Sequence, residues 1–436
     1  MFPRNDMKRI PSRWIAAASA LLALVLIGTS RVDGARRPRY GGELRVETRA
    51  VLRTLDPADS DPLALGARAQ LIPAVFETLV RFDEHGEAQP CLATSWTHDA
   101  ARKRWVFTAR ANVLLHNGTL WSPKGGVIEM PDDRPLAAIL RELAQPSRAI
   151  VVRADDGSLL GTGPFRIAQW EAEKSARLVA HDGYWAGRPF LDAIEIRMGR
   201  PLRDQEMDLE SGKTDVADIL VTDARRIRQK GLSVSSTPFT ETLALVFENP
   251  RVPDAVREAL ALSIDRATIN NVLLQKKGEP SAALLPRWLS GYSFLFPTAR
   301  NIVRAKQLAA STAPLTFSYD RQDAILRPVG ERIAVNASEA GIVLKSSTGQ
   351  ADVRLVSLPI TSLDSWTSLE NLSAMLKIAL PRAASEPFEV ESALLNGYRI
   401  IPLVHLPQMW VTSGNVKNWP RLADVWLDVL NEKAKP

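Results

Sequence analysis

The sequence predicts an α/β protein in which helices and strands alternate along the chain. The 436-residue chain is too long for one ordinary core, and its 45% hydrophobic and 24% charged residues are typical of a globular protein. Segments of alternating polarity, which indicate half-buried strands, are interleaved with segments whose apolar residues recur at helical spacing. This interleaving favours an α/β or mixed architecture over an all-β one.

The N-terminus has the three-part layout of a secretory signal peptide. Four basic residues precede an unbroken run of apolar or small residues at Ile15–Ile27. That run is shorter than the roughly 20 residues that a membrane span needs. We therefore expect residues 1–34 to be a signal peptide that is removed before Ala35, with an uncleaved anchor as the alternative.

Charge and cysteine content narrow the class of protein further. The formal net charge of +6 falls when residues 1–34 are removed, and so small a surplus does not indicate a nucleic-acid-binding protein. Cys91 is the single cysteine, so an intramolecular disulfide is excluded. Because Cys91 lies far from the signal segment, it is not a lipoprotein anchor, and we expect a soluble periplasmic protein.

The first half of the chain is predicted to alternate strands with short helices. Glu43–Thr48 alternates apolar and polar residues, as a half-buried strand does. Helical spacing predicts a helix over Leu63–Phe82, despite Pro73, and another that begins after Pro135. The other strands expected here are Trp105–Arg110, Phe165–Ile167, Leu191–Arg197 and Val216–Leu220.

The second half repeats this alternation. Asp254 precedes the clearest amphipathic helix, Val256–Ile264. We expect Thr268 to cap a second helix through Leu274, which Gly278 stops. The remaining expected elements are a strand at Leu315–Tyr319, a helix through Ile333 and Val335, a strand at Ile342–Leu344 and a loop-and-helix tail at Asn415–Leu430.

Six motifs follow one another between about residues 40 and 280. They are Tyr40–Val46, Val75–Asp83, Pro90–Trp96, Gly161–Phe165 with Tyr184–Asp192, Ser211–Asp215, and Val256–Leu260 with Ile264–Arg266. In this order they resemble the motifs of the bacterial extracellular solute-binding protein family 5, the dipeptide- and oligopeptide-binding proteins of ABC transporters.

The resemblance implies a two-lobed periplasmic-binding-protein-like α/β fold (type II, cluster C-like) with mixed sheets. The extra subdomain is expected to be reduced, because Leu120 runs almost directly into Gly125–Val127, where family members usually carry a longer insert. The expected division is residues 1–34 as signal peptide, 35–247 as lobe 1 with the reduced subdomain at about 56–150, 248–407 as lobe 2, and 408–436 as the return to lobe 1.

Sequence motifs of catalysis or metal binding are missing. The five histidines are scattered without a zinc-binding pair, and Ser211–Thr214 ends like a phosphate loop but has Met207 where the upstream glycine is required. The acidic pairs Asp132-Asp133 and Asp155-Asp156 are interpreted as solvated turns. We therefore expect no enzyme activity, no cofactor and no metal.

Candidate ligand-binding residues come from aromatic and acidic positions in the second half. Trp288, Trp366 and Trp410 offer flat faces for stacking, with core packing as the alternative. Asp364 is a candidate to hold a ligand amine, with helix capping as its alternative. Phe247-Glu248 belongs to the segment that resembles the family's crossing strand, and Glu248 stands where the family has an asparagine.

The family resemblance implies the substrate-binding component of an ABC importer. Such a protein captures a peptide or a similar small solute between its lobes by hinge motion and delivers it to the membrane subunits. Family members also carry nickel complexes, sugars and opines. We expect a monomer without a nucleic-acid partner; the alternative is a sensor or structural relic of the same fold with a lost or altered pocket.

Overall fold

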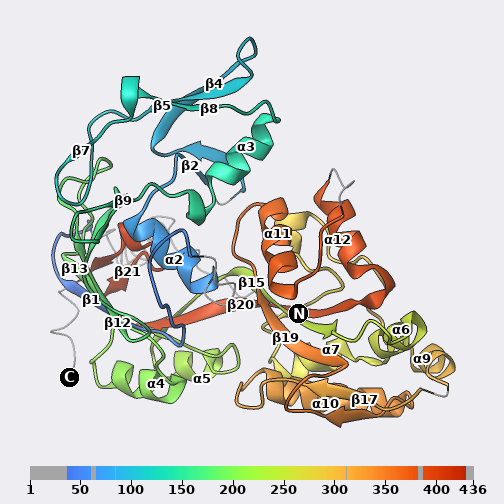
Figure 1. Cartoon of the computed structure of the whole chain (residues 1–436). Coiled ribbons are helices and arrows are strands. Elements are labelled where there is room, and N and C mark those ends of the chain that lie inside the picture. The colour runs from blue at the N-terminus through green and yellow to red at the C-terminus, as the bar shows by residue number, and fades with distance from the viewer. Residues whose placement is uncertain (1–36, 60–64, 84, 311, 382–385, 429–436) are drawn as a thin grey trace, which may run out of the picture. The chain divides into compact units, whose positions relative to one another are not determined.

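The computed structural model describes residues 37–59, 65–83, 85–310, 312–381 and 386–428 (Figure 1). The expected signal peptide at 1–34 lies outside these ranges. The residues from Tyr40 onward form one compact unit, and the fold described below is that of this unit alone. Within the described ranges, no helix has both the length and the apolar character needed to cross a membrane.

One large mixed sheet organises the described part of the chain. Its path is β11-β12-β13-β1-β14-β20-β15-β19-β17-β18, and β16 pairs with β20 outside this path. In that order the strands are Phe165–Glu171, Ser175–Ala180, Ala193–Arg197, Glu43–Glu47, Val216–Asp218, Ile400–Thr412, Ser233–Phe247, Val353–Pro359, Leu315–Ser318 and Leu344–Ser346, with β16 at Glu279–Pro280.

Two long antiparallel strands, β15 and β20, connect the two halves of this sheet. They pair from Ser233 opposite Thr412 to Val246 opposite Ile400, with three register shifts between. On one side β1 runs parallel to β13 and β14, and on the other β17 runs parallel to β18 and β19. β14 is antiparallel to β20 and β19 is antiparallel to β15, and in this register the carboxyl ends of β14 and β19 both point toward the middle of the β15/β20 pair.

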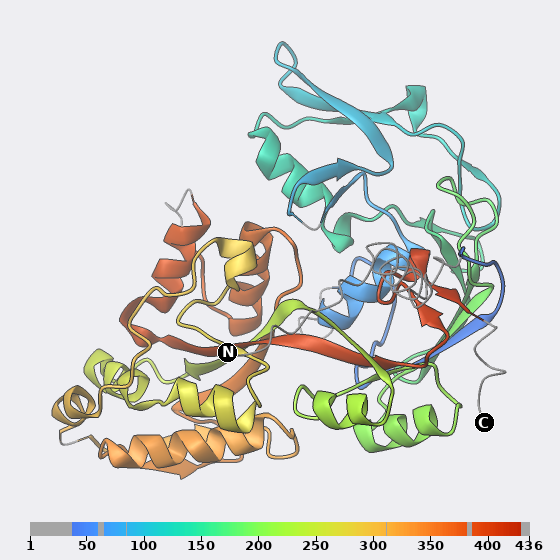
Figure 2. The ribbon, with the colours of Figure 1, turned by 180° about the vertical axis from the view of Figure 1, so that it is seen from behind.

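Most helices flank the large sheet, whereas one, α3 (Leu136–Leu143), packs in a separate core of residues 79–150. Their bounds are Leu65–Val75 (α2), Leu136–Leu143 (α3), Leu202–Glu210 (α4), Ala224–Gln229 (α5), Asp254–Ser263 (α6), Arg266–Thr268 (α7), Arg287–Ser290 (α8), Ile302–Leu308 (α9), Leu326–Glu339 (α10), Ser365–Leu376 (α11) and Pro387–Leu395 (α12). Both views show α11 and α12 on one face of β20 and α10 on the other (Figure 1, Figure 2).

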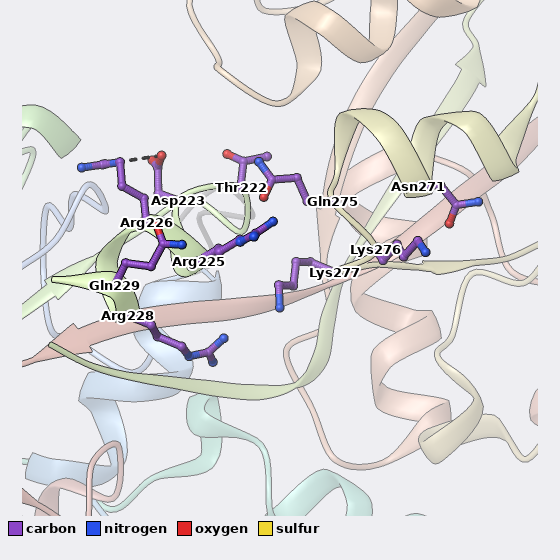
Figure 3. Close-up of a pocket in the computed structure, with 10 residues that line it drawn as sticks. All are labelled: Thr222, Asp223, Arg225, Arg226, Arg228, Gln229, Asn271, Gln275, Lys276 and Lys277. Atoms are coloured by element: carbon purple, nitrogen blue, oxygen red, sulfur yellow. Dashed lines mark ion pairs between the residues drawn. The ribbon is translucent and has the colours of Figure 1, made fainter. Parts of the chain in front are cut away.

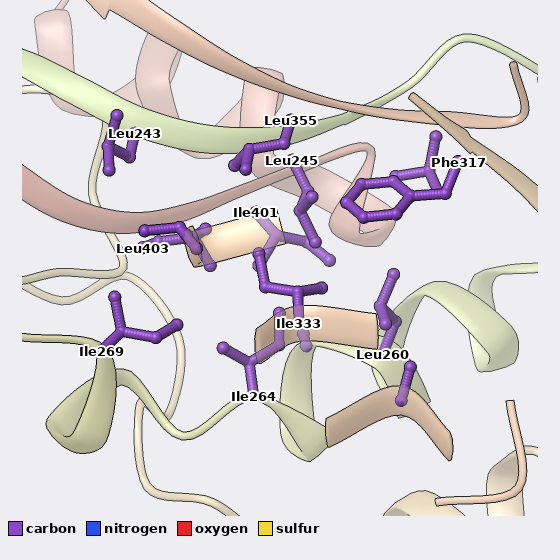
Figure 4. Close-up of a cluster of buried hydrophobic side chains, with 14 of the residues drawn as sticks. Leu243, Leu245, Leu260, Ile264, Ile269, Phe317, Ile333, Leu355, Ile401 and Leu403 are labelled. Atoms are coloured by element: carbon purple, nitrogen blue, oxygen red, sulfur yellow. The ribbon is translucent and has the colours of Figure 1, made fainter. Parts of the chain in front are cut away.

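Separate hydrophobic cores lie on the two sides of the long strands. Leu245, Leu260 and Ile333 belong to a core between the sheet and the helices α6 and α10 (Figure 4). Leu44 and Ile194 belong to another core on the β1 side. Burial of apolar surface, which contributes about 25 cal/mol per Å², is the main stabilising contribution in each core. Two cores explain why two halves connected by β15 and β20 can each hold their own shape.

Residues 79–150 carry a further core and small sheets of their own. Phe107 packs with Ile139 and Leu143 of α3. The strands here are Val80–Phe82 (β2), Ala88–Pro90 (β3), Ala93–Asp99 (β4), Arg104–Ala109 (β5), Val113–Leu114 (β6), Leu120–Trp121 (β7) and Val127–Met130 (β8). This core lies within the region expected to be a reduced subdomain; the exact domain boundaries stay a prediction, and the one at 407 falls inside β20.

Three sequence-based elements differ from the structure. The helix expected over Leu63–Phe82 ends at Val75, because Val80–Phe82 pairs as a strand with Ala88–Pro90. Thr268 does not cap a helix; Asp265 caps α7 by accepting a hydrogen bond from the Thr268 amide, and Ile269–Leu273 continues as a π-turn.

The tail is the third difference. Between residues 415 and 428, the part of the tail that the structure describes, it forms a small antiparallel pair, β21 (Val416–Lys417) with β22 (Trp426–Leu427), and one short 3-10 turn, Leu422–Asp424. Val416 and Leu427 are buried in the core on the β1 side. Tertiary burial therefore overrides the local helical preference.

Candidate functional site

The carboxyl ends of strands from both halves of the sheet meet near a group of charged residues. Arg49 follows β1, Asp218 ends β14, and Asp323 follows β17. The Arg49 amide donates to Asp218 Oδ2 at 2.8 Å, and the Arg49 guanidinium lies 3.9 Å from Asp323 Oδ2. In open α/β sheets, ligands bind beside the carboxyl ends of strands. Arg49 thus links the two halves where the fold favours a ligand site.

Burial controls the protonation of two acids in this group. It raises the pKa of the Asp218 carboxyl, against hydrogen bonds from Arg49 and Thr48 that lower it. It also raises the pKa of Glu241 in β15, against a hydrogen bond from Ser357 that lowers it. The charge of Arg49 lowers both pKa values, so Arg49 favours the ionised form of two acids that burial disfavours.

A second contact between distant segments lies at the amino end of α11. The turn between β2 and β3 approaches the backbone before α11 so closely that a Cβ atom on Gly86 would lie 2.8 Å from the Leu363 carbonyl oxygen. Gly86 also has a φ of +78°, which favours glycine. A cavity of about 130 Å³ remains here, lined by His85, Gly86, Trp288, Leu289, Leu363, Asp364 and Ser365.

Asp364 lines this cavity and also caps α11. Its Oδ2 accepts hydrogen bonds at 2.8 Å from both the amide and the hydroxyl of Thr367. This is the capping role considered from the sequence, and a carboxylate at a helix amino end is also favoured by the helix dipole. The cap holds the carboxylate in one orientation at the cavity wall.

Trp366 connects α11 to α3. Its indole nitrogen donates to Glu370 Oε1 at 2.9 Å, and the Arg141 guanidinium of α3 lies 5.2 Å from the ring centroid. This spacing is within the range of a cation–π contact. Residues 79–150 therefore contact the α11 side through both Gly86 and Arg141.

The loop that carries Trp288 is held by a buried carboxylate. Glu391 of α12 is fully buried and accepts hydrogen bonds from the amides of Leu284 and Leu285 and, at 2.6 Å, from the Tyr292 hydroxyl. Burial raises the pKa of Glu391 to about 7, although these hydrogen bonds lower it. This anchoring places Trp288, which is 36% exposed, at the cavity wall.

The other candidate residues lie elsewhere. Phe247 is 2% exposed within the core shown in Figure 4, and Trp410 is 3% exposed in the β1-side core, where it packs edge to face on Trp419. Glu248 forms an ion pair with Arg354 at 2.5 Å. The structure thus brings together Trp288 and Asp364, with Trp366 close by, and leaves the remaining three outside this cavity.

Sequence reasoning missed Arg49, Asp218, Arg141 and Glu391. The carboxyl-end rule applied to the predicted strands would have pointed to Arg49, because it directly follows the expected strand Glu43–Thr48. Asp218 lies in the middle of the expected strand Val216–Leu220 and ends the strand only in the structure. Arg141 and Glu391 carry no local signal, since their partners are far away in the sequence.

The reactive side chains outside this region serve packing. Cys91 is buried, and burial raises its thiol pKa to about 12, so the nucleophilic thiolate is disfavoured. His116 and His181 both contact the Gly163 carbonyl oxygen and support its turn. Among the described residues, no group of three or more His, Cys, Asp or Glu side chains is placed to hold a metal ion.

The size of the cavity limits what this conformation can hold. Pockets for small ligands usually have a volume of about 300–1,000 Å³. The 130 Å³ beside Asp364 has room for only a few atoms. A larger solute would require the walls to separate.

Comparisons with known proteins agree on the fold. The chain is 23% identical over 394 residues to the "Probable D,D-dipeptide-binding periplasmic protein DdpA" of Escherichia coli (strain K12), covering 76% of this chain and 75% of that protein. DppA of Helicobacter pylori, solved with the peptide STSA, has a TM-score of 0.73 and 16% identity, covering 89% of this chain and 98% of that one.

A third comparison involves a different ligand. AgaA of Agrobacterium tumefaciens R10, solved with agropinic acid, has a TM-score of 0.69 and 18% identity, covering 89% of this chain and 99% of that one. These neighbours are two-lobed periplasmic binding proteins, and the chain has their fold.

The sequence model described as "Bacterial extracellular solute-binding proteins, family 5 Middle" matches residues 127–352, just over half of the chain. Members of this family bind and transport substrates and are not enzymes. The chain therefore belongs to the bacterial extracellular solute-binding proteins of family 5 and has a solute-binding role.

Proposed function

We propose that this protein is the substrate-binding component of an ABC importer and captures its solute at the amino end of α11. The observation that carries the proposal is the meeting of Trp288, Asp364 and the turn at Gly86 around one cavity. These groups come from two separately packed parts of the chain, residues 79–150 and the α11 side, and hinge closure around a ligand requires groups from two such parts.

The favoured ligand is a peptide or a similar small solute with a cationic or planar group. Trp288 supplies an aromatic face and Asp364 a fixed carboxylate, which can pair with an ammonium. Similar proteins support a peptide or small solute, since one is named for binding a D,D-dipeptide and two others were solved with a short peptide and with agropinic acid.

The solute would be delivered to the membrane in the way that the family resemblance implies. The exported protein, released from its signal at 1–34, would act as a monomer in the periplasm and carry its solute to the membrane subunits of the importer. Similar proteins that are described as periplasmic, such as DdpA, support this location.

The test is calorimetric and thermal-shift screening of the protein from residue 35 against pools of dipeptides, opines, sugars and metal complexes. A true ligand should raise the thermal midpoint, because at 100 times its Kd it adds about 2.7 kcal/mol to the free energy of unfolding by mass action. Asp364→Asn keeps a good helix cap but removes the charge, so it should weaken the binding of a cationic ligand about tenfold, while the lost interaction with the helix dipole lowers the midpoint of the free protein only slightly. Asp155→Asn, at an exposed turn, is the matched control.

Two results would count against the proposal. A ligand whose affinity is unchanged in both Asp364→Asn and Trp288→Leu would bind elsewhere. If no pool shifts the midpoint, the protein is better explained as a sensor or structural relic of the same fold.

A further inference from the structure

A cationic groove lies along the edge of β20, away from the cavity beside α11. It has a volume of about 910 Å³, and its walls include Arg225, Arg226 and Arg228 on α5 and the pair Lys276 and Lys277 before β16 (Figure 3). Nothing in the solute-binding role described above uses these residues.

The groove spans the connection between the two halves of the sheet. β14, which precedes α5, pairs with β20 at Trp410–Thr412. β16, which follows Lys277, pairs with β20 at Val404 and His405. Because β15 pairs along the opposite edge of β20, β14 and β16 pair with the same edge of β20, one in each half of the sheet.

Most of the positive charge in this groove is uncompensated. Arg226 forms ion pairs with Glu206 and, at 3.4 Å, with Asp223. No such partner is found for Arg225, Arg228, Lys276 or Lys277 within the described ranges of the chain. Four like charges gathered without counter-charges repel one another, and a bound anion would relieve that repulsion.

The backbone that presents the lysines is unusual. Gln275 and Lys276 have φ values of +51° and +59°, directly after the π-turn Ile269–Leu273. The turn is held by Lys276 N donating to the Asn270 carbonyl oxygen at 2.8 Å and by Gly278 N donating to Asn270 Oδ1 at 3.0 Å. Left-handed non-glycine residues and π-turns cost energy and cluster at functional sites.

We propose that this groove binds a multivalent phosphate-bearing anion that contacts both walls at once. Guanidinium groups bind phosphate oxygens in bidentate fashion, and lysines add point charges. Two arginines on one wall and two lysines on the other suit a small molecule with several phosphate groups. The two walls belong to different halves of the sheet, so the anion can contact both walls only at one distance between them. Binding therefore favours the arrangement of the two halves that has this distance.

The test measures tripolyphosphate binding by calorimetry at 50 and 200 mM salt, on the protein from residue 35. Arg228→Gln/Lys276→Gln, which changes one exposed residue on each wall, should weaken binding at least tenfold and reduce its salt dependence. Arg304→Gln/Lys306→Gln, on the exposed face of α9, removes the same charges and should leave the affinity unchanged. Circular dichroism checks that both variants fold.

A second readout separates anion binding from its effect on the hinge. Saturating tripolyphosphate should change the radius of gyration measured by X-ray scattering in the wild type but not in Arg228→Gln/Lys276→Gln. An unchanged radius despite binding would remove the hinge part of the proposal.

Other outcomes would overturn the proposal itself. Equal losses in the groove and control variants would mean that only overall charge matters. Citrate binding as tightly as tripolyphosphate would replace phosphate by carboxylate as the recognised group. If the protein sediments with phosphatidylglycerol vesicles but does not bind tripolyphosphate, the groove is a binding site for a membrane surface. These results do not depend on whether the cavity beside α11 binds a solute.

Discussion

The cavity beside α11 joins residues 79–150 to the α11 side, whereas the groove along β20 joins the two halves of the sheet, and the two are built in opposite ways. At the cavity, charged groups are paired within the chain: Asp364 caps α11, and Arg141 lies over Trp366. In the groove, Arg228 and Lys276 lack such partners among the described residues, and the space is about seven times larger. The comparison teaches that the cavity offers a partner one carboxylate that the chain already holds in place, whereas the groove offers several cations without ion-pair partners in the described residues.

The largest expected effect concerns Glu391, which holds the cavity loop. Burial raises the pKa of Glu391 to about 7 in the folded protein from its ordinary 4.5. Its contribution to stability is therefore fully present below about pH 4.5 and is lost as the pH rises through 7. At about 1.4 kcal/mol for each tenfold change in acidity, the loss is about 3 kcal/mol.

Urea unfolding between pH 4.5 and 8 measures this loss. The wild type should lose stability across the range relative to Glu391→Gln, whereas the exposed Glu331→Gln should follow the wild type. Parallel curves for the wild type and Glu391→Gln would contradict the prediction.

A smaller effect is expected at the groove wall. A Cβ atom on Gly278 would lie 2.3 Å from Val404 Cγ1, so Gly278→Ala should destabilise the protein by about 1–3 kcal/mol through overpacking. Gly349→Ala, where no atom lies within 4 Å of the added Cβ, is the control. Equal unfolding free energies for the two variants would show that the wall adapts freely, and would weaken the argument for a fixed lysine pair.

The Arg141 and Trp366 contact should be weaker still. A double-mutant cycle with Arg141→Ala and Trp366→Leu is expected to give a coupling of about 0.5–1 kcal/mol, the usual range of an exposed cation–π contact. Unfolding free energies from urea titrations measure it. A coupling indistinguishable from zero would mean that the turn at Gly86 alone joins residues 79–150 to α11.

The smallest effect is expected for Arg49 and Asp323. Their charged groups are 3.9 Å apart, and the Arg49 side chain is 51% exposed. Solvent screening should limit their coupling to about 0.3 kcal/mol, and high salt should abolish it. A coupling above about 1 kcal/mol in the cycle of Arg49→Gln and Asp323→Asn would identify this pair as a main connection between the halves.

Local patterns predicted many elements because their causes are local. The alternation over Glu43–Thr48 gave a strand at Glu43–Glu47, and helical spacing after Pro135 gave α3. The helix expected over Leu63–Phe82 was too long, because pairing of β2 with β3 is a contact that spacing does not encode. The same limit explains the tail, whose apolar residues are buried as a strand pair.

The candidate site was predictable only in part. Capping by Asp364 depends on Thr367, three residues away, and so is visible in the sequence. The approach of Gly86 to Leu363 joins segments far apart, and no local pattern marks it. Trp288 and Trp410 are the same residue type, yet one is 36% and the other 3% exposed.

By itself, the sequence determined the α/β class and the family, because periodicity, turns and ordered motifs depend on neighbouring residues. Only the tertiary structure decided which tryptophan reaches a cavity, which carboxylate is buried to a pKa of about 7, and which cations share a groove. The physical reason is that burial and charge pairing depend on distances in space between segments that the order of residues leaves undefined.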